Sequence, residues 1–275
     1  MTSIPAVGLG ADVTIPQLGY GVFQVPDAET EAAVGHAFEA GYRHVDTAAI
    51  YGNETGVGRA VASSGLPRDE VFVTTKLWNN RQGAESTPRA LAASLERLGL
   101  DYVDLYLIHW PAPSQDKYLE TWEAFLELQQ EGLVRAIGVS NFQPAHLRRI
   151  IEATGVSPAI NQIELHPWLQ QEELRAFGAE HRIATEAWSP LAQGGSHLAE
   201  PALVEIAGAY GKTVAQVILR WHLQLGNVVI PKSATPARIQ ENVDVFDFEL
   251  SAADMDAIRR LDRGERTGFD PDTFS

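Results

Sequence analysis

Short apolar segments alternate with amphipathic segments along almost the whole chain. The apolar segments are rich in Val, Ile, Leu and aromatic residues. Several are continuously apolar, which is typical of strands buried on both faces. The pattern predicts eight strands, near residues 19–23, 44–48, 71–77, 103–110, 134–141, 159–165, 183–189 and 227–232.

The segments between these strands have helical periodicity. We expect one helix to be capped by Asp27 and to end at Gly41, and another to cover residues 87–100. A helix near the end of the chain begins at Ser251, where the sequence SAAD has a capping-box pattern with Asp in place of Glu. Further helices are predicted near 118–131, 144–153, 171–180, 200–210 and 213–225.

Regular alternation of strands and helices favours a parallel sheet. With 275 residues and eight strands, the chain fits one α/β domain, a TIM (β/α)8 barrel of about 250 residues. A doubly wound open sheet is the alternative. Residues 8–19 contain Gly and Pro and are expected to form a hairpin before the barrel, and the helix from Ser251 is an extra C-terminal helix. We therefore expect a single barrel domain over residues 1–275.

The charge balance limits the class of partner. There are 21 Lys and Arg against 36 Asp and Glu, a net charge of −15, which argues against general affinity for nucleic acid or an anionic membrane. An anionic ligand therefore needs a local cationic pocket. The absence of cysteine excludes disulfides, thiolate metal sites and a cysteine nucleophile. The first residues do not resemble a signal peptide, and no stretch approaches the ~18 apolar residues of a membrane span. These observations predict a cytoplasmic protein.

Familiar phosphate-binding and nucleophile motifs are missing. Gly8 and Gly10 are followed by Val13, and Gly56 and Gly58 by Val61, where a dinucleotide fingerprint has its third glycine. There is no Walker loop and no G-x-S-x-G elbow. A Rossmann nucleotide site is therefore not supported.

Polar or aromatic residues occur at nearly every predicted strand end. Function in a TIM barrel lies at the C-terminal ends of the strands. Alone, each residue has an ordinary explanation, such as a solvated lysine, a turn aspartate or a core histidine. Seven successive strand ends of this kind instead predict a lined pocket: Asp46 with Tyr51, Lys76 with Trp78, His109 with Trp110, Ser140 with Asn141, Asn161 with Gln162, Trp188 with Ser189, and Lys232 with Ser233.

Four of these residues fit one chemistry. The hydroxyl group of Tyr51 is a weak acid with an ordinary pKa near 10, and a lysine ammonium such as Lys76 beside it favours the phenolate and lowers that pKa. Asp46 keeps the lysine charged and oriented, and His109 donates a hydrogen bond that aligns a carbonyl substrate. The four residues would form an acid that protonates a carbonyl oxygen as hydride arrives, with no metal.

Three segments resemble the signatures of the aldo-keto reductases. The first is GYRHVDTA over 41–48 followed by Tyr51, Asn53, Glu54, Val57 and Gly58; the second is GLVRAIGVSNF over 132–142; the third is IPKS over 230–233 followed by Arg238, Glu241 and Asn242. They occur in the family's order and span most of the chain. The tail GFDPD over 268–272 resembles the prokaryotic 2,5-diketo-D-gluconate reductase branch.

The resemblance implies a TIM barrel that binds NADPH without a Rossmann fold, with Tyr51 as general acid and Asp46, Lys76 and His109 as its partners. It assigns the remaining cofactor contacts by position. Ser140, Asn141 and Gln162 would hold the nicotinamide carboxamide, Trp188 would stack on the ring, Ser189, Leu191 and Gln193 would lie in the loop over the pyrophosphate, and Lys232, Ser233, Arg238, Glu241 and Asn242 would hold the 2′-phosphate and adenosine. Ala192 stands where relatives usually have glycine.

The leading hypothesis is NADPH-dependent reduction of small aldehydes, ketones or keto-sugars by a monomer that has no nucleic-acid, membrane or metal partner. We expect the substrate wall to contain Val22, Phe23, Trp78 and Trp110. One alternative is a cofactor-occupied sensing module, because barrel subunits of some channels resemble reductases. Another is a metal-dependent barrel isomerase or hydrolase, for which Glu164 and His166 alone are too few ligands.

Overall fold

The computed structural model describes residues 4–10 and 12–275. Its main sheet has eight parallel strands paired in chain order, and each lies inside a range predicted from the sequence. The strands are β3 (Tyr20–Gly21), β4 (His44–Asp46), β5 (Phe72–Leu77), β6 (Val103–Ile108), β7 (Val134–Ser140), β8 (Ile160–Glu164), β9 (Ala184–Trp188) and β10 (Val228–Val229).

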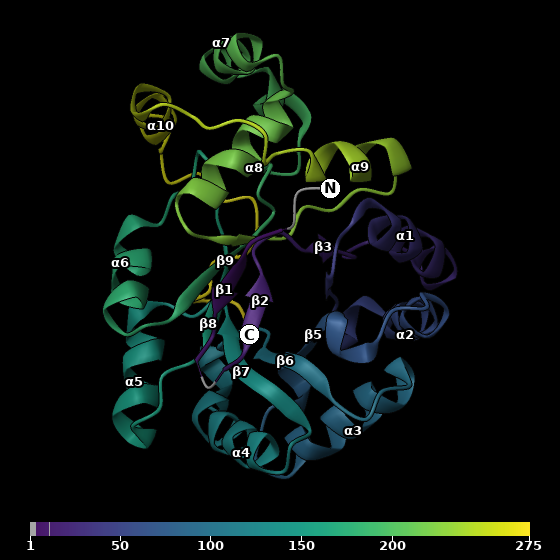
Figure 1. Ribbon diagram of the computed structural model, residues 1–275. Coiled ribbons are helices and arrows are strands. Elements are labelled where there is room, and N and C mark those ends of the chain that lie inside the picture. Colours follow the sequence, from purple (N-terminus) through teal and green to yellow (C-terminus); the bar gives the residue numbers. More distant parts are fainter. Residues whose placement is uncertain (1–3, 11) are drawn as a thin grey trace.

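The sheet closes on itself. Leu18 and Val229 form a parallel bridge, and the backbone N–H of Gly19 donates to the Val229 carbonyl oxygen at 2.9 Å. The first and last strands are thereby joined, with helices arranged around the strands (Figure 1). The closed TIM barrel is confirmed over the doubly wound sheet.

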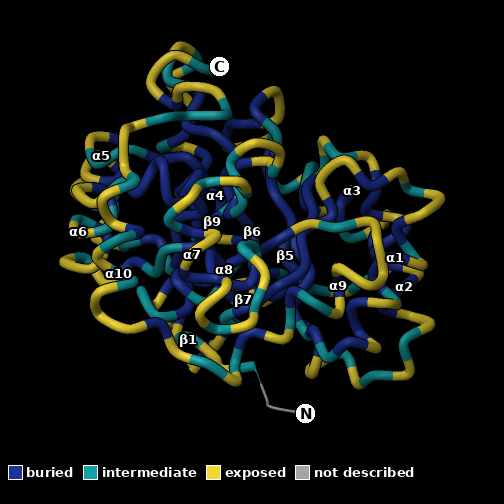
Figure 2. The backbone as a smooth tube through the Cα atoms, turned by 90° about the horizontal axis from the view of Figure 1, so that it is seen from above, coloured by how far each residue is buried: buried dark blue, intermediate teal, exposed yellow. Residues whose placement is uncertain are grey.

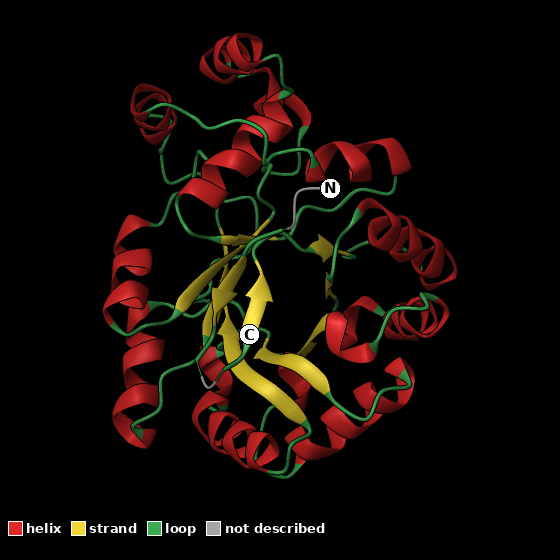
Figure 3. Cartoon of the chain, viewed as in Figure 1, coloured by secondary structure: helices red, strands yellow, loops and turns green. Residues whose placement is uncertain are grey.

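Helices surround the barrel, as Figure 3 shows in red around the yellow strands. Eight of them agree with the sequence pattern to within a few residues: α1 (Asp27–Ala40), α3 (Ser86–Leu98), α4 (Tyr118–Gln130), α5 (Pro144–Thr154), α6 (Glu172–Glu180), α7 (Pro201–Tyr210), α8 (Val214–Gln224) and α10 (Ala252–Arg259). The pattern missed α2 (Glu54–Ser63) and α9 (Pro236–Val243).

The glycines of α2 explain why it was missed. A Cβ atom on Gly56 would lie 2.7 Å from the Asp27 carbonyl oxygen, and one on Gly58 would lie 2.1 Å from the Leu98 carbonyl oxygen. The helix therefore needs glycine to pack closely against α1 and the end of α3. Glycine has low helix propensity, so tertiary packing overrides the local signal here.

The predicted helix ends have mixed outcomes. Gly41 ends α1 with φ of 104°, and the Ser251 hydroxyl accepts from the Asp254 N–H in a complete capping box, as expected. The capping role predicted for Asp27 is wrong. Pro26 occupies the cap position of α1, and the Asp27 carboxylate instead accepts from the Gly56 N–H at 2.6 Å. Asp27 thus joins α1 to α2.

The predicted hairpin is present and covers the N-terminal end of the barrel. Strands β1 (Ala6–Gly8) and β2 (Thr14–Pro16) pair antiparallel. Fully buried Ile15 of β2 lies in a cluster with side chains from five barrel strands. These are Phe72, Leu105, Leu107, Ala136, Ile160 and Val228. Viewed from above, the backbone is buried in the middle of the molecule and exposed around its rim (Figure 2).

No single helix within residues 4–10 and 12–275 has the length and apolar character to cross a membrane. Helices α7 and α8 meet these criteria only together, and they are bent by 88°. Both helices instead place fully buried side chains, such as Leu203 and Ile218, in the protein core.

Candidate active site

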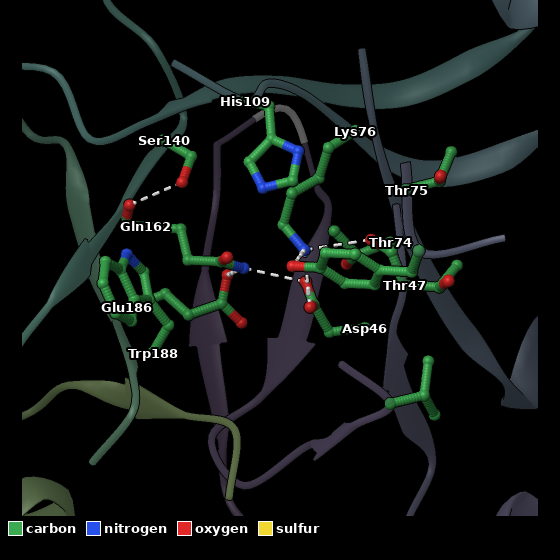
Figure 4. Close-up of polar contacts among 12 residues, drawn as sticks. Asp46, Thr47, Thr74, Thr75, Lys76, His109, Ser140, Gln162, Glu186 and Trp188 are labelled. Carbon is green, nitrogen blue, oxygen red and sulfur yellow. Dashed lines mark hydrogen bonds and ion pairs between the residues drawn. The ribbon is translucent and has the colours of Figure 1, made fainter. Parts of the chain in front are cut away.

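Parallel pairing brings the polar side chains of separate strands to one end of the barrel. Asp46 ends β4, and Lys76 lies near the end of β5. Gln162 and Glu186 come from β8 and β9, which pair with each other at these two residues. Figure 4 shows the four side chains converging in the barrel interior.

Lys76 is the centre of this group and is fully buried. Its Nζ atom lies 2.6 Å from Asp46 Oδ1, 2.9 Å from the Thr47 carbonyl oxygen and 3.4 Å from the Tyr51 hydroxyl. An ammonium group has three protons, so these oxygens account for all of them. The structure therefore brings Asp46, Lys76 and Tyr51 together.

The charge on Lys76 survives burial. Desolvation acts to lower the pKa of Lys76, but the charge of Asp46 and its hydrogen bond hold this pKa above its ordinary value. Burial raises the pKa of Tyr51, and the nearby ammonium opposes this without reversing it. The net direction for Tyr51 is opposite to the lowering expected from sequence. Tyr51 thus retains its proton at neutral pH and has one to donate.

His109 follows β6 and faces the same group. Its ring centroid lies 5.7 Å from that of Tyr51 and 5.1 Å from that of Trp78, edge to face in both cases. Burial and the charge of Lys76 lower the pKa of His109 well below its usual value. The imidazole is therefore neutral, and a neutral imidazole has one N–H to donate.

Amide and hydroxyl groups form a second cluster beside these residues. Ser140 Oγ donates to the Gln162 carbonyl oxygen at 2.8 Å, and Asn141 Nδ2 donates to Ser140 Oγ and to the His109 carbonyl oxygen, both at 3.0 Å. The indole N–H of Trp188 donates to Asn141 Oδ1 at 2.8 Å. The four residues predicted from sequence to surround a nicotinamide thus lie in one hydrogen-bonded cluster.

The loop after β9 has an unusual backbone. Ser189, Ala192 and Gln193 have φ of 47°, 47° and 62°, in the left-handed region. Leu191 is half-buried and Ala192 is buried. Left-handed backbone costs an alanine about 1–2 kcal/mol, which explains why glycine suits the position of Ala192.

The cations predicted to hold the cofactor phosphate lie after β10 and on α9. Lys232 and Arg238 are exposed and have no ion-pair partner among the residues that the structure describes, whereas Lys212, between α7 and α8, contacts Asp244 and Asp247. The Tyr20 hydroxyl donates to the Ser233 carbonyl oxygen at 2.6 Å and so ties this segment to β3. Glu241 accepts from Thr213, and Asn242 is buried.

Aromatic side chains lie beside the site residues at the C-terminal end of the barrel. Trp110 is almost fully buried, Trp78 is half-buried, and exposed Phe23 lies 5.0 Å from the Tyr51 ring. Val22 has no exposed surface. Two residues that the sequence interpretation missed also pack here. The ring centroid of Phe274 lies 4.8 Å from that of Trp110, and the Phe274 ring stacks on that of Phe269 with 4.4 Å between their centroids.

The C-terminal tail that carries these phenylalanines is attached through buried Glu164 at the end of β8. The N–H and hydroxyl of Thr267 both donate to Glu164 Oε1 at 2.6 Å, and the Gly268 N–H donates to Oε2 at 3.1 Å. A Cβ on Gly268 would lie 2.5 Å from the Trp188 ring. The tail therefore packs directly against the predicted nicotinamide site.

Glu164 and Glu186 were both missed as site residues. Each lies two positions from a predicted site residue on its own strand, Gln162 on β8 and Trp188 on β9. Side chains at i and i+2 of a strand share a face. This alternation is the sequence signal that could have identified both glutamates as site residues.

Comparison with known proteins agrees with the arrangement. Residues 16–263 match the family described as "Aldo/keto reductase family". A Mycolicibacterium smegmatis protein named aldo-keto reductase is 57% identical over 271 residues, 98% of each chain. A Yersinia pestis protein named methylglyoxal reductase DkgA is 53% identical, covering 100% of this chain and 99% of its own.

Solved structures agree as well. A crystal structure of a Gox0644 mutant in complex with NADPH is 48% identical, covers 100% of both chains and has a TM-score of 0.95. The resemblance to the aldo-keto reductases noted in the sequence is confirmed, and the relatives named DkgA agree with its 2,5-diketo-D-gluconate reductase-like branch. This chain belongs to the aldo/keto reductase family.

Proposed function

We propose that this protein reduces small aldehydes, ketones or keto-sugars to alcohols with NADPH, and that Tyr51 is the general acid. The observation that carries the proposal is the buried Asp46–Lys76–Tyr51 chain, with Lys76 Nζ within 3.4 Å of the Tyr51 hydroxyl. Proteins named methylglyoxal reductase among its relatives support a small carbonyl substrate.

The side chains divide the work on the carbonyl group. NADPH, when bound, supplies the hydride that the carbonyl carbon receives. Tyr51 gives its proton to the carbonyl oxygen, and the Lys76 ammonium stabilises the phenolate that remains. Asp46 holds the ammonium in place, and neutral His109 donates a hydrogen bond that orients the carbonyl oxygen.

The cofactor assignment rests on the chemistry of the free groups. Lys232 and Arg238 are cations without ion-pair partners among the described residues of a protein with a net charge of −15, so they suit a 2′-phosphate. Ser140, Asn141 and Gln162 would hold the nicotinamide carboxamide, Trp188 would cover the ring, and the loop with Ser189, Leu191 and Gln193 would lie over the pyrophosphate. The four proposed catalytic residues come from one chain, so a monomer contains all the groups that the proposed reduction needs.

Replacing Tyr51 with Phe tests the general acid. Removing the proton donor should lower kcat by about 10²–10⁴-fold, measured as NADPH oxidation with methylglyoxal and a panel of aldehydes. NADPH binding, followed by tryptophan fluorescence, should be nearly unchanged. Tyr210→Phe is the matched control, because it removes a hydroxyl that bonds to Asp254 on α10. Retained turnover in Tyr51→Phe would show that another group is the acid.

Replacing Arg238 or Lys232 with Ala tests the phosphate contact. Loss of a charged hydrogen bond of roughly 1.5–3 kcal/mol should weaken NADPH binding about 10–100-fold and leave NADH binding almost unchanged. Arg259→Ala removes an exposed cation on α10 and serves as the control. Equal losses for both cofactors would mean that neither cation binds the 2′-phosphate.

A further inference from the structure

A second carboxyl group lies in the barrel interior, and the proposed reduction has so far given it no role. Glu186 on β9 is fully buried. Its Oε2 atom accepts a hydrogen bond from Gln162 Nε2 at 2.8 Å, and the same nitrogen donates to Asp46 Oδ2 at 2.8 Å. Figure 4 shows Gln162 between Glu186 and Asp46.

This bridge determines the orientation of the Gln162 side chain. An amide nitrogen has two protons, and here each proton has one carboxyl acceptor. Rotating the amide by half a turn would place its oxygen against Asp46 Oδ2 and Glu186 Oε2, and both carboxyl groups would lose the hydrogen bond from Gln162. Gln162 Oε1 has no hydrogen-bond partner among residues 4–10 and 12–275, so it is available to accept from a bound amide.

The groups around Glu186 do not neutralise it. His44 and Asp46 face it from β4, Lys76 from β5, and Tyr51 from the turn after β4. His44 Nε2 lies 3.7 Å from Glu186 Oε1, but burial and the charge of Lys76 lower the pKa of His44 to about 3. His44 is therefore uncharged at neutral pH, and Lys76 is already paired with Asp46.

A neutral carboxylic acid fits this site. Burial and the charge of Asp46 raise the pKa of Glu186 to about 8. Because Oε2 accepts from Gln162, the proton belongs on Oε1, the oxygen on the side of His44. Glu186 Oε1 accepts from no donor in the described part of the chain, so no hydrogen bond there stabilises a carboxylate oxygen.

We propose that Glu186 is a positioning residue for the reduction: as an uncharged acid it orients Gln162 and leaves the Asp46 carboxylate as the partner of Lys76. This inference rests on the proposed function. Loss of the Glu186 proton places a second negative charge near Lys76 and Tyr51, which further raises the pKa of Tyr51 and makes it a weaker acid. Activity should therefore decline as the pH rises through the ionisation of Glu186.

The test compares the pH profiles of kcat and of KM for NADPH between about pH 6 and about pH 10 in the wild type, Glu186→Gln and Glu186→Leu. In the wild type, kcat should fall with a midpoint near pH 8. Glu186→Gln offers Gln162 the same acceptor but cannot ionise. It should lose this decline and keep more of the kcat at neutral pH than Glu186→Leu does. Glu186→Leu offers no acceptor and should raise KM for NADPH and lower kcat about tenfold.

Asp104→Asn is the matched control for changing a buried carboxyl. Asp104 lies on β6 and accepts from Arg68 and Arg135, outside the site. This variant should lower the unfolding temperature and keep the wild-type pH profile. If Glu186→Gln does not fold, infrared difference spectra of the wild type across the pH range take its place. They should show the carboxylic acid band of a buried acid disappear near pH 8.

Three results separate the hypotheses. An unchanged decline near pH 8 in folded Glu186→Gln, or no such infrared change, overturns the inference for Glu186 alone. A loss of activity in Glu186→Gln as large as in Glu186→Leu shows that the charge is needed, and also overturns it. Retained turnover in Tyr51→Phe instead overturns the proposed function, whatever the Glu186 variants do.

Discussion

The two ends of the barrel are built from the same strands and have opposite chemistry. Strand β5 contributes Phe72 to the N-terminal end and Lys76 to the C-terminal end, and β8 contributes Ile160 to the first and Gln162 to the second. All four side chains are buried. The first end is an apolar cluster closed by the hairpin, whereas the second is a chain of charged and amide groups.

This difference separates stability from activity along each strand. Apolar burial stabilises the fold by about 25 cal/mol per Å², so the N-terminal end favours folding. Buried charges are costly unless they are paired and hydrogen-bonded. The C-terminal end therefore depends on complete pairing, and on the rest of the barrel to hold it. Substitutions at the two ends should have distinct effects.

The largest effect is expected at the C-terminal end. Lys76→Met removes the ammonium that stabilises the Tyr51 phenolate, and kcat should fall by about 10²–10³-fold, measured in single turnovers with saturating NADPH. Lys212→Met, which removes a lysine paired with Asp244 and Asp247 near α7, should leave kcat unchanged. A loss of less than tenfold in Lys76→Met would deny Lys76 its catalytic role.

Ile15→Ala tests the opposite end. Ile15 is fully buried in the hairpin cluster, so truncation should lower the free energy of unfolding by about 2–5 kcal/mol, measured in urea. The kcat of the folded variant should not change, because the catalytic groups lie at the other end. Val204→Ala, at a side chain that is 49% exposed, should have little effect on either quantity. A fall in kcat for Ile15→Ala would mean that the two ends are coupled.

Glu164→Gln tests a buried carboxylate that anchors the tail. Burial opposes ionisation of Glu164, but donors from His166, Thr267 and Gly268 hold its pKa below the ordinary value. A carboxyl group whose pKa is lowered by folding contributes its full stabilisation at pH values above its ordinary pKa of about 4.3. This stabilisation is lost as the pH falls through the pKa of the folded state. Glu164→Gln should therefore cost roughly 1–3 kcal/mol at neutral pH.

The difference between wild type and Glu164→Gln should shrink in acid. Urea unfolding at a series of pH values measures it. Exposed Glu173→Gln on α6 should show no such trend. A difference that stays constant down to about pH 3 would mean that ionised Glu164 does not hold the tail.

The smallest effect is expected from Gly268→Ala. The added Cβ would meet the Trp188 ring at 2.5 Å, so the tail must shift at a cost of about 1–3 kcal/mol. KM for the carbonyl substrate should rise about tenfold with a smaller change in kcat, measured in steady-state assays. Gly208→Ala on α7, where a Cβ meets nothing within 4 Å, is the control. Unchanged kinetics in Gly268→Ala would show that the tail can shift without disturbing the site.

The sequence predicted the barrel well because its strands are continuous apolar runs that end in polar residues. The sequence also pointed to four candidate site residues because each lies at or just after a strand end, and the ends of barrel strands bring their side chains together. These residues are Asp46, Tyr51, Lys76 and His109. The eight-strand order then follows from the parallel alternation of strands and helices.

Other features depended on long-range contacts that no local pattern contains. The glycines of α2 weaken its helical signal because they serve contacts with α1 and the end of α3. Phe274 and Phe269 reach Trp110 because the tail packs against the barrel, where Glu164 binds it. The upward direction of the Tyr51 pKa depends on its burial. Each of these three features can be identified only from the three-dimensional arrangement of the chain.

The closure of the barrel also limits when the barrel can form during synthesis on the ribosome. Gln17 beside the hairpin donates to the Leu223 and Asn227 carbonyl oxygens, and Asn227 is 210 positions later in the chain. At a synthesis rate of about 5–20 residues per second, roughly 10–40 s pass before these acceptors are made. During that time β3 has one edge without its final neighbour, and unpaired strand edges promote aggregation. The nascent chain must therefore stay soluble with an open barrel for most of its synthesis.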